Sequence, residues 1–127
     1  MDLLQIANAI LISDEGVLVA RNNEGPELYL PGGKVELGEG ILHALYREMS
    51  EEFPHIVLLN HKLYDSVCFR TPRSNKSAKA HAFICEFSGS TEPAADIRGI
   101  GWARQPGPQY TKPTNYFLSK LLEERHI

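Results

Sequence analysis

Three glutamates crowd the segment 47–53, which reads REMSEEF, and they stand at positions 48, 51 and 52. On a helix, which turns by about 100° per residue, their side chains fall within an arc of about 100°. Like charges at spacings of three and four residues repel each other, so a solvated helix surface is one interpretation. The other is a site for a divalent cation, because Mg²⁺ is a hard ion that prefers oxygen ligands.

A pair of glycines precedes this segment, in the stretch PGGKVELGE. We expect Gly32 and Gly33 to form a turn at the end of a strand, where glycine lets the backbone approach a ligand closely. Counting from Gly33, the chain has five residues, Glu39, seven residues, an Arg-Glu pair, Met49, one residue and a Glu-Glu pair. A glycine turn that can approach a ligand, placed before the acidic helix, favours the metal site over the solvated surface.

The spacing resembles the Nudix box, Gly-x5-Glu-x7-Arg-Glu-U-x-Glu-Glu-x-Gly-U, in which U is a bulky aliphatic residue. Such a match is far more specific than a lone GxGxxG. The six matching positions are Gly33, Glu39, Arg47, Glu48, Glu51 and Glu52. The resemblance implies a single Nudix domain over residues 1–127, with the box at about 33–54. It also implies an α/β/α sandwich with a mixed β-sheet and a catalytic loop and helix, which hydrolyses nucleoside diphosphates linked to another moiety.

The resemblance assigns Mg²⁺ or Mn²⁺ as the cofactor and gives roles to the acidic residues. Glu48 and Glu52 are implied as direct metal ligands, and Glu51 contributes directly or through water. The Gly32 carbonyl is implied as a further ligand. Bound metal would neutralise phosphate oxygens and lower the pKa of a water that attacks phosphorus. Glu48 is the expected general base.

Other residues are expected to position these groups. Arg47 orients a glutamate through charge-assisted hydrogen bonds. Glu39 holds the junction of loop and helix, or alternatively complements the helix dipole. Gly33 admits the substrate to the backbone. Arg21, at the end of a strand, is either a contact for phosphate or an ordinary exposed arginine.

Two departures from the family pattern affect the site. The last glycine of the box is Pro54 here, and the aliphatic residue after it is His55. Proline cannot adopt the left-handed cap that glycine allows, so we expect the helix to end differently, with a modest displacement of the site. Many MutT-like relatives also carry one more metal-binding carboxylate in a later loop, and the candidates for it are Glu86, Glu92 and Asp96.

Asn115 lies in the segment KPTNYF, near the start of the last expected helix. Asparagine favours helix N-caps, but MutT-type enzymes place a base-reading asparagine in a similar P-x-N setting, and both interpretations stay open. With the short chain, this asparagine favours a MutT-like house-cleaning enzyme. Its substrates would be nucleoside triphosphates, oxidised purine nucleotides among them, cleaved to a monophosphate and pyrophosphate. The alternatives are an ADP-ribose or nucleotide-sugar pyrophosphatase and a non-catalytic nucleotide sensor.

Hydrophobic periodicity predicts the elements that must hold these residues. Strands outnumber helices and one helix interrupts them early, which is typical of an α+β fold with a mixed sheet. The expected strands are 6–12, 17–21, 28–30, 56–59, 63–69, 78–87 and 97–103, and the expected helices are 40–53 and 114–125.

Composition restricts the function further. The chain has 127 residues, which suggests one domain, and a net charge of −3, which argues against the coating of a nucleic acid. Cys68 and Cys85 lie in apolar runs and are expected to be reduced, buried thiols. A basic leader and a membrane-length apolar run are both missing, so we expect a cytoplasmic protein without membrane contact. Nudix proteins are often dimers, so the resemblance also predicts a homodimer.

Overall fold

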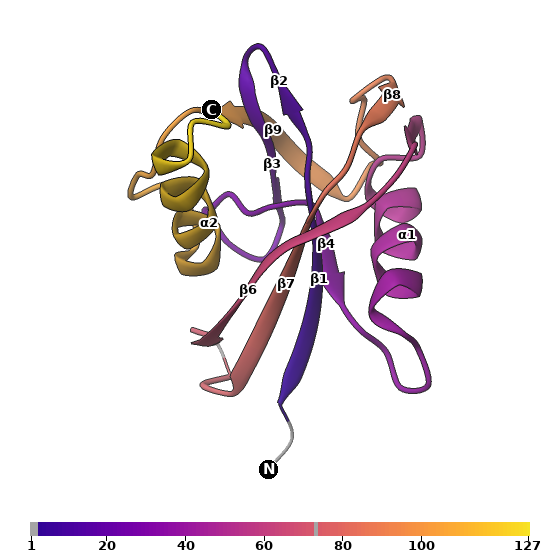
Figure 1. The fold of residues 1–127 in the computed structure, drawn as a ribbon. Coiled ribbons are helices and arrows are strands. Elements are labelled where there is room, and N and C mark those ends of the chain that lie inside the picture. Colours follow the sequence, from indigo (N-terminus) through magenta and orange to yellow (C-terminus); the bar gives the residue numbers. More distant parts are fainter. Residues whose placement is uncertain (1–2, 73) are drawn as a thin grey trace.

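The computed structural model describes residues 3–72 and 74–127. It has the α+β architecture that the sequence predicts, and Figure 1 traces it along the chain. Its elements are β1 (Leu4–Ile10), β2 (Ile12–Ser13), β3 (Gly16–Asn22), β4 (Gly32–Lys34), α1 (Ile41–Glu52), β5 (Ile56–Leu58), β6 (Lys62–Arg70), β7 (Ser77–Ile84), β8 (Phe87–Gly89), β9 (Ile97–Ala103) and α2 (Lys112–Glu123).

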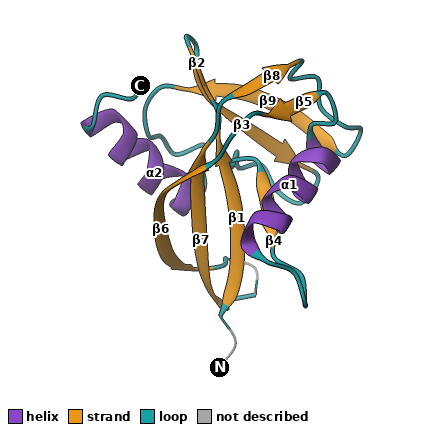
Figure 2. Ribbon diagram, turned by 45° about the vertical axis from the view of Figure 1, so that its right-hand side comes forward, coloured by secondary structure: helices purple, strands orange, loops and turns teal. Residues whose placement is uncertain are grey.

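The central sheet has four strands in the order β4-β1-β7-β6. Strand β1 runs parallel to β7 and antiparallel to β4, and β6 pairs antiparallel with β7, so the sheet is mixed. The other strands form a three-stranded sheet of β2, β3 and β9 and a small pair of β5 and β8. The two helices lie on opposite sides of the central sheet in both views (Figures 1 and 2), which gives the expected sandwich.

Two hydrophobic clusters hold the helices against the sheet. Alternate side chains of β1 face opposite sides, so Ala7 and Ala9 join the cluster that includes α1, whereas Ile10 joins the cluster that includes α2. The buried helix residues are Ala44, Leu45 and Met49 in α1 and Phe117, Leu118 and Leu121 in α2. Burying a large apolar side chain contributes about 1.5–3 kcal/mol, so both helices are anchored firmly.

The structure corrects the expected strand at 28–30 and the expected glycine turn after it. Leu28 and Tyr29 form only isolated bridges, and the strand begins at Gly32 instead. Gly32 has a φ of 130°, and a side chain there would clash with the Ala7 carbonyl on β1. Glycine therefore lets β4 pair closely with β1, directly after Pro31, which has no N–H to offer a ladder.

Several smaller expectations also needed correction. The segment 6–12 is divided between two sheets, so only β2 forms a hairpin with β3. Leu42 and Leu122 were expected in the core but are 40% and 42% exposed, because each lies beside the buried arc of its helix. Cys85 is a buried free thiol as expected, whereas Cys68 is a free thiol exposed on the edge strand β6.

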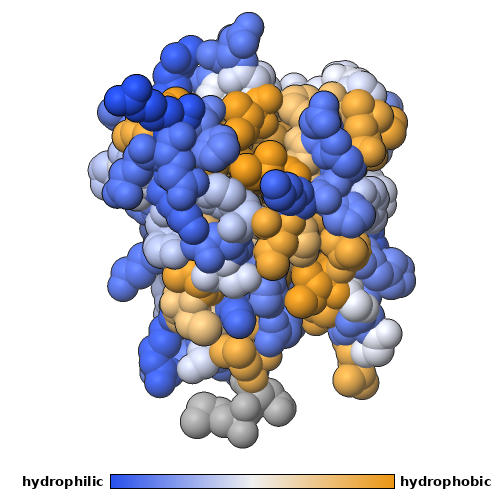
Figure 3. Space-filling view, in the orientation of Figure 1, coloured by the Kyte–Doolittle hydropathy of each residue, from blue (hydrophilic) through white to orange (hydrophobic). Residues whose placement is uncertain are grey.

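Part of the molecular surface is apolar. Figure 3 shows apolar side chains in the middle of the face that β6 crosses in Figure 1. Val57, Leu59 and Leu63, in and around β5 and β6, are each more than half exposed. Within the described part of the chain, neither helix is long and apolar enough to cross a membrane.

Candidate active site

The C-terminal turn of α1 holds two of the three glutamates. The helix ends at Glu52, and its C-cap residue Phe53 has a φ of −133°, which is not left-handed. Pro54 follows, so the helix ends without a left-handed cap, as the sequence predicts. The Phe53 N–H donates to the Met49 carbonyl at 2.8 Å, and the Ala94 N–H donates to the Glu52 carbonyl at 2.9 Å. These bonds fix the last turn although the usual glycine is absent.

Arg47 connects the loop before α1 to the acidic face of the helix. Its Nε donates to Glu39 Oε2 at 2.6 Å and its Nη2 donates to Glu39 Oε1 at 2.9 Å. The same Nη2 reaches the Lys34 carbonyl at 3.1 Å. Its Nη1 donates to Glu48 Oε1 at 3.0 Å and to Glu51 Oε1 at 3.3 Å. One guanidinium therefore sets the positions of three carboxylates and a carbonyl of β4.

Glu39 is a structural partner in this arrangement. Its side chain is 7% exposed, and its Oε1 also accepts the Glu36 N–H at 2.9 Å. The hydrogen bonds from Arg47 lower the pKa of Glu39 to about 2, and the backbone bond acts in the same direction. Helix α1 has no side-chain cap at its N-terminus. The hydrogen bonds of Glu39 to Arg47 and to the Glu36 N–H agree with its expected role of holding the junction of loop and helix.

Glu52 is a buried carboxylate, with 8% of its surface exposed. Its Oε1 accepts the Gly32 N–H at 2.8 Å. Within residues 3–72 and 74–127, no lysine, arginine or histidine forms an ion pair with it. Burial, together with the negative charges of Glu48 and Asp96, raises the pKa of Glu52 to about 8 despite the lowering effect of the Gly32 hydrogen bond. Burial of a carboxylate normally requires a positive partner, which Glu52 lacks.

Gly33 leaves the space that the Glu48 carboxylate occupies. A Cβ at this position would lie 2.5 Å from Glu48 Cδ and 2.7 Å from both carboxylate oxygens. Any larger residue must therefore push the carboxylate away from its place beside Arg47. Burial raises the pKa of Glu48, whereas the hydrogen bond from Arg47 lowers it. Gly32 and Gly33 thus position two glutamates of α1: Gly32 binds Glu52 by a hydrogen bond, and Gly33 leaves space for Glu48 by having no side chain.

Tyr29 is a site residue that the sequence reasoning missed. Its hydroxyl is the one fully buried side-chain nitrogen or oxygen in the described residues that has no hydrogen-bond partner. Burial raises the pKa of Tyr29, and the charges of Glu52 and Asp96 raise it further. The Asn22 amide lies near enough to lower the pKa slightly, but it does not reach hydrogen-bonding geometry. The sequence offered no signal for this role, because Tyr29 reads as an ordinary strand residue.

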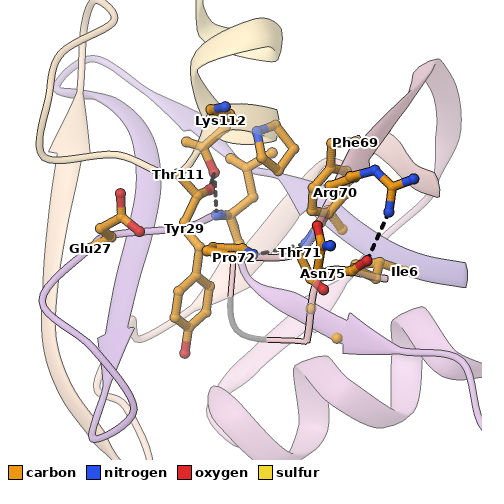
Figure 4. A pocket seen from close by; sticks show the side chains of 16 residues that line it. Ile6, Glu27, Tyr29, Phe69, Arg70, Thr71, Pro72, Asn75, Thr111 and Lys112 are labelled. Carbon is orange, nitrogen blue, oxygen red and sulfur yellow. Dashed lines mark hydrogen bonds between the residues drawn. The ribbon is translucent and has the colours of Figure 1, made fainter. Parts of the chain in front are cut away.

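A cavity of about 600 Å³ adjoins the glycine strand. Its wall includes Gly32 and Gly33, so the cavity lies next to the backbone that positions the glutamates. Figure 4 shows Phe69 and Arg70, from the end of β6, on one side and Thr111 and Lys112, at the start of α2, on another. Apolar walls with a few polar groups are typical of a small-molecule site.

A family model described as the NUDIX domain matches residues 3–106. The chain belongs to the Nudix family. The strands, the loop–helix and the acidic cluster described above are therefore those of a MutT-like Nudix hydrolase.

Solved structures of other Nudix proteins are similar. The MutT NUDIX hydrolase from Burkholderia pseudomallei has 26% sequence identity and a TM-score of 0.77, over 93% of this chain and 97% of that chain. The MutT protein from Methanosarcina mazei Go1 shares the fold, with 17% identity and a TM-score of 0.80 over 98% and 95% of the two chains. A bifunctional NMN adenylyltransferase/ADP ribose pyrophosphatase from Francisella tularensis, complexed with AMP and a Mn ion, shares it with 20% identity and a TM-score of 0.70, over 97% and 42%. No curated protein matches significantly in sequence.

A divalent cation fits the acidic site of this Nudix domain. Among the described residues, Glu52 has no positive partner, and the negative charges of Glu48 and Asp96 act on it. Carboxylate oxygens are donors that Mg²⁺ and Mn²⁺ prefer. In the described part of the chain, no three His, Cys, Asp or Glu side chains are close enough to hold an ion as they stand. The carboxylates would therefore turn toward the ion as it binds.

The later-loop carboxylates differ in their distance from this Nudix site. Asp96 is near enough for its charge to raise the pKa of both Glu52 and Tyr29. Glu86 is hydrogen-bonded to the Asn60 side chain instead. Glu92 is not among the main causes of either raised pKa. The geometry therefore favours Asp96 among the candidates for an additional metal ligand.

Two residues predicted to bind substrate do not line the cavity of this Nudix fold. Arg21 lies opposite Gly99 of β9 and its side chain passes over that glycine, where a Cβ would lie 3.6 Å from Arg21 Nη2. Asn115 lies inside α2, and Thr111 is the N-cap residue, so the expected helix cap was wrong. The Asn115 amide instead donates to the Gly107 carbonyl at 2.9 Å and accepts the Gly107 N–H at 3.0 Å. Base reading by Asn115 stays a prediction, and it requires the release of Gly107.

Replacement of Asn115 by aspartate separates these roles. The introduced carboxylate keeps an acceptor for the Gly107 N–H but sets a second oxygen against the Gly107 carbonyl. We expect Asn115→Asp to lower the free energy of unfolding by about 1–2 kcal/mol, whereas the kcat/KM ratio of purine to pyrimidine triphosphates changes only if Asn115 reads the base. Thermal melting and kinetics measure the two effects, with Ser119→Ala as a control one turn further along α2. A tenfold fall in that ratio would instead establish base reading.

Proposed function

We propose that this Nudix hydrolase cleaves nucleoside triphosphates to a monophosphate and pyrophosphate in the presence of Mg²⁺ or Mn²⁺. One observation carries the proposal: the 600 Å³ cavity shares Gly32 and Gly33 with the acidic cluster of α1. A nucleoside in the cavity therefore places its phosphate chain beside Glu48 and Glu52. Oxidised purine nucleotides are included as substrates, and removal of such nucleotides in the cytoplasm is the proposed role.

The residues that would hold the metal are Glu48, Glu51, Glu52, the Gly32 carbonyl and Asp96. When bound, the ion supplies positive charge for phosphate oxygens and acidifies a water. A Mn ion is present in the Francisella tularensis structure with the same fold, which supports the choice of metal. Loss of a proton from Glu52 is a condition for binding, because burial holds its pKa near 8 without a positive partner.

Glu48 is the proposed general base. Arg47 holds its Oε1 at 3.0 Å, and Gly33 leaves the carboxylate free of side-chain contact on the β4 side. The hydrogen bond keeps one oxygen in place, so the second is free to accept a proton from water. Arg47 acts as a positioning residue, because it touches the base and the loop and stays charged throughout.

A second enzyme function fits the same site. The Francisella tularensis neighbour is described as an ADP ribose pyrophosphatase, and ADP-ribose or a nucleotide sugar also joins a nucleoside to a diphosphate. A non-catalytic nucleotide sensor is disfavoured, because binding alone does not require the complete set of Glu48, Glu51 and Glu52. A homodimer is part of the proposal, supported by the exposed apolar side chains Val57, Leu59 and Leu63, and sedimentation velocity tests it.

A substrate panel tests the proposed function. The panel contains the common and oxidised purine triphosphates, ADP-ribose and a UDP-sugar, each with Mg²⁺ and with a chelator. We expect pyrophosphate and nucleoside monophosphate from triphosphates at a kcat/KM at least tenfold above that for ADP-ribose. Release of single phosphate groups would contradict the proposed bond cleavage. Preference for ADP-ribose would establish the second function instead.

A further inference from the structure

Asn8 stands in the middle of β1 and lines the cavity. Alternate residues of a strand face the same side of the sheet, so Asn8 shares its row with Ile6 and Ile10, which pack with the cluster around α2. A polar residue in such a row is unusual for packing alone. Neither the Nudix box nor the acidic cluster explains it.

The Asn8 amide has a fixed orientation. Its Nδ2 donates to the Leu30 carbonyl at 3.1 Å and to the Pro31 carbonyl at 3.3 Å. Carbonyl oxygens only accept hydrogen bonds, so rotation of the amide by 180° would set Oδ1 against two acceptors. Both N–H groups are therefore committed to the protein, and only Oδ1 is available to a ligand.

The free Asn8 Oδ1 opens to the cavity. No described residue donates a hydrogen bond to it. It is not fully buried, because among the described residues the Tyr29 hydroxyl is the only fully buried side-chain nitrogen or oxygen without a partner. The residues opposite Asn8 in the neighbouring strands are Gly32 and Ala82, which have the smallest side chains. Nothing in either strand partner is large enough to cover the amide.

Several other polar side chains around the cavity have hydrogen-bond partners. The Thr71 hydroxyl bonds to Ser74, and the Thr114 hydroxyl accepts the Leu30 N–H at 3.2 Å. The Arg70 guanidinium, visible in Figure 4, donates to a backbone carbonyl of its own hairpin at 2.8 Å. The Asn8 oxygen thus differs from these groups, because it is neutral, accepts only, and is unengaged.

We propose that Asn8 selects the nucleobase by accepting a hydrogen bond from the exocyclic amino group of a purine. The inference rests on the proposed nucleotide substrate and deepens it. A rigid acceptor favours a base that offers an N–H and disfavours one that offers a carbonyl or nothing, because the oxygen is then left unpaired in the filled cavity. The fixed amide cannot turn to donate instead.

Matched nucleotides test the inference on the substrate side. ATP is compared with purine riboside triphosphate, and GTP with ITP, since each pair differs by one amino group. We expect the wild type to favour the amino-bearing member of one pair by about tenfold in kcat/KM. Asn8→Leu, which is similar in shape, is expected to reduce that ratio to about one by slowing only the amino-bearing member. Asn60→Ala, outside the cavity, is the control and keeps the ratio.

Each outcome of this experiment supports or overturns the proposed role of Asn8 in selecting the nucleobase. Equal kcat/KM values within both pairs for the wild type would overturn the inference, whether or not Asn8→Leu folds. A ratio that survives in folded Asn8→Leu overturns it as well. Failure of the wild type to cleave any of the four nucleotides overturns the proposed function, and this inference with it.

Discussion

Glu52→Gln is expected to lower kcat at least a hundredfold and to leave the fold intact. In the structure, the Gly32 N–H donates to Glu52 Oε1 at 2.8 Å. Glutamine keeps an oxygen that can accept this hydrogen bond, but it removes the negative charge that would hold the metal. Loss of one strong charge interaction in a transition state costs about 2.7–4 kcal/mol, which corresponds to a hundredfold or more. Steady-state kinetics with saturating Mg²⁺ and circular dichroism provide the measurements.

The same substitution is expected to change how stability depends on pH. Burial raises the pKa of Glu52 from 4.5 to about 8, so the folded protein keeps a proton that the unfolded chain has lost. The contribution of Glu52 to stability without metal is therefore full below about pH 4.5 and falls as the pH rises toward 8, by at most about 1.4 kcal/mol per unit. Glutamine does not titrate, so Glu52→Gln removes this fall and is more stable than the wild type at pH 8.

Addition of Mg²⁺ and substitution of the neighbouring Glu51 provide two controls for this pH dependence. Mg²⁺ binds the folded state and should restore the stability of the wild type at pH 8 but not that of Glu52→Gln. Glu51→Gln should keep the pH dependence, because the Glu51 side chain is 57% exposed. Wild-type turnover in Glu52→Gln would remove the basis for a metal site on α1. If the free energy of unfolding of Glu52→Gln falls with pH as steeply as that of the wild type, another group titrates.

Gly33→Ala is expected to lower kcat/KM by about tenfold to a hundredfold. The new Cβ would lie 2.5 Å from Glu48 Cδ, so the carboxylate must leave its position beside Arg47. Displacement of a catalytic group by about 1 Å can cost a hundredfold. The flexible end of Glu48 absorbs the contact, so the fold should survive, and thermal melting checks this.

Gly40→Ala is the matched control, because a Cβ there meets no atom within 4 Å and the residue has an ordinary φ of −81°. Its stability should change by less than about 1 kcal/mol, and its kcat/KM by less than about twofold. If both alanine variants retain wild-type kcat/KM, the position of Glu48 does not limit catalysis and another base must be sought.

Local patterns explain why much of the fold could be predicted. The apolar spacing in 40–53 and the proline after it predict a helix, and α1 spans Ile41–Glu52. The strand expected at 97–103 is also found, as β9, because its pattern depends on neighbouring residues only. The positions of the box glutamates on one helix follow from the same periodicity.

Long-range contacts explain what could not be predicted. The pairing of Gly32 with Asn8 joins residues far apart in the chain, so the sequence alone suggested a turn there. Burial of Glu52 depends on β4 and on the Ala94 region rather than on helical spacing. Asn115 reads as a cap because of its type, but its partner is Gly107, across a proline-rich loop.

The short strand β4 has a consequence for how such an enzyme could diversify. Helix α1 approaches this strand with its glutamates, whereas the cavity reaches it from β1, the end of β6 and the start of α2. Mutations in the cavity wall can therefore exchange one substrate for another without disturbing the reactive groups. Under the proposed function, substrate recognition in the cavity and bond cleavage at α1 can change separately, and Gly32 and Gly33 are the residues that the two regions share.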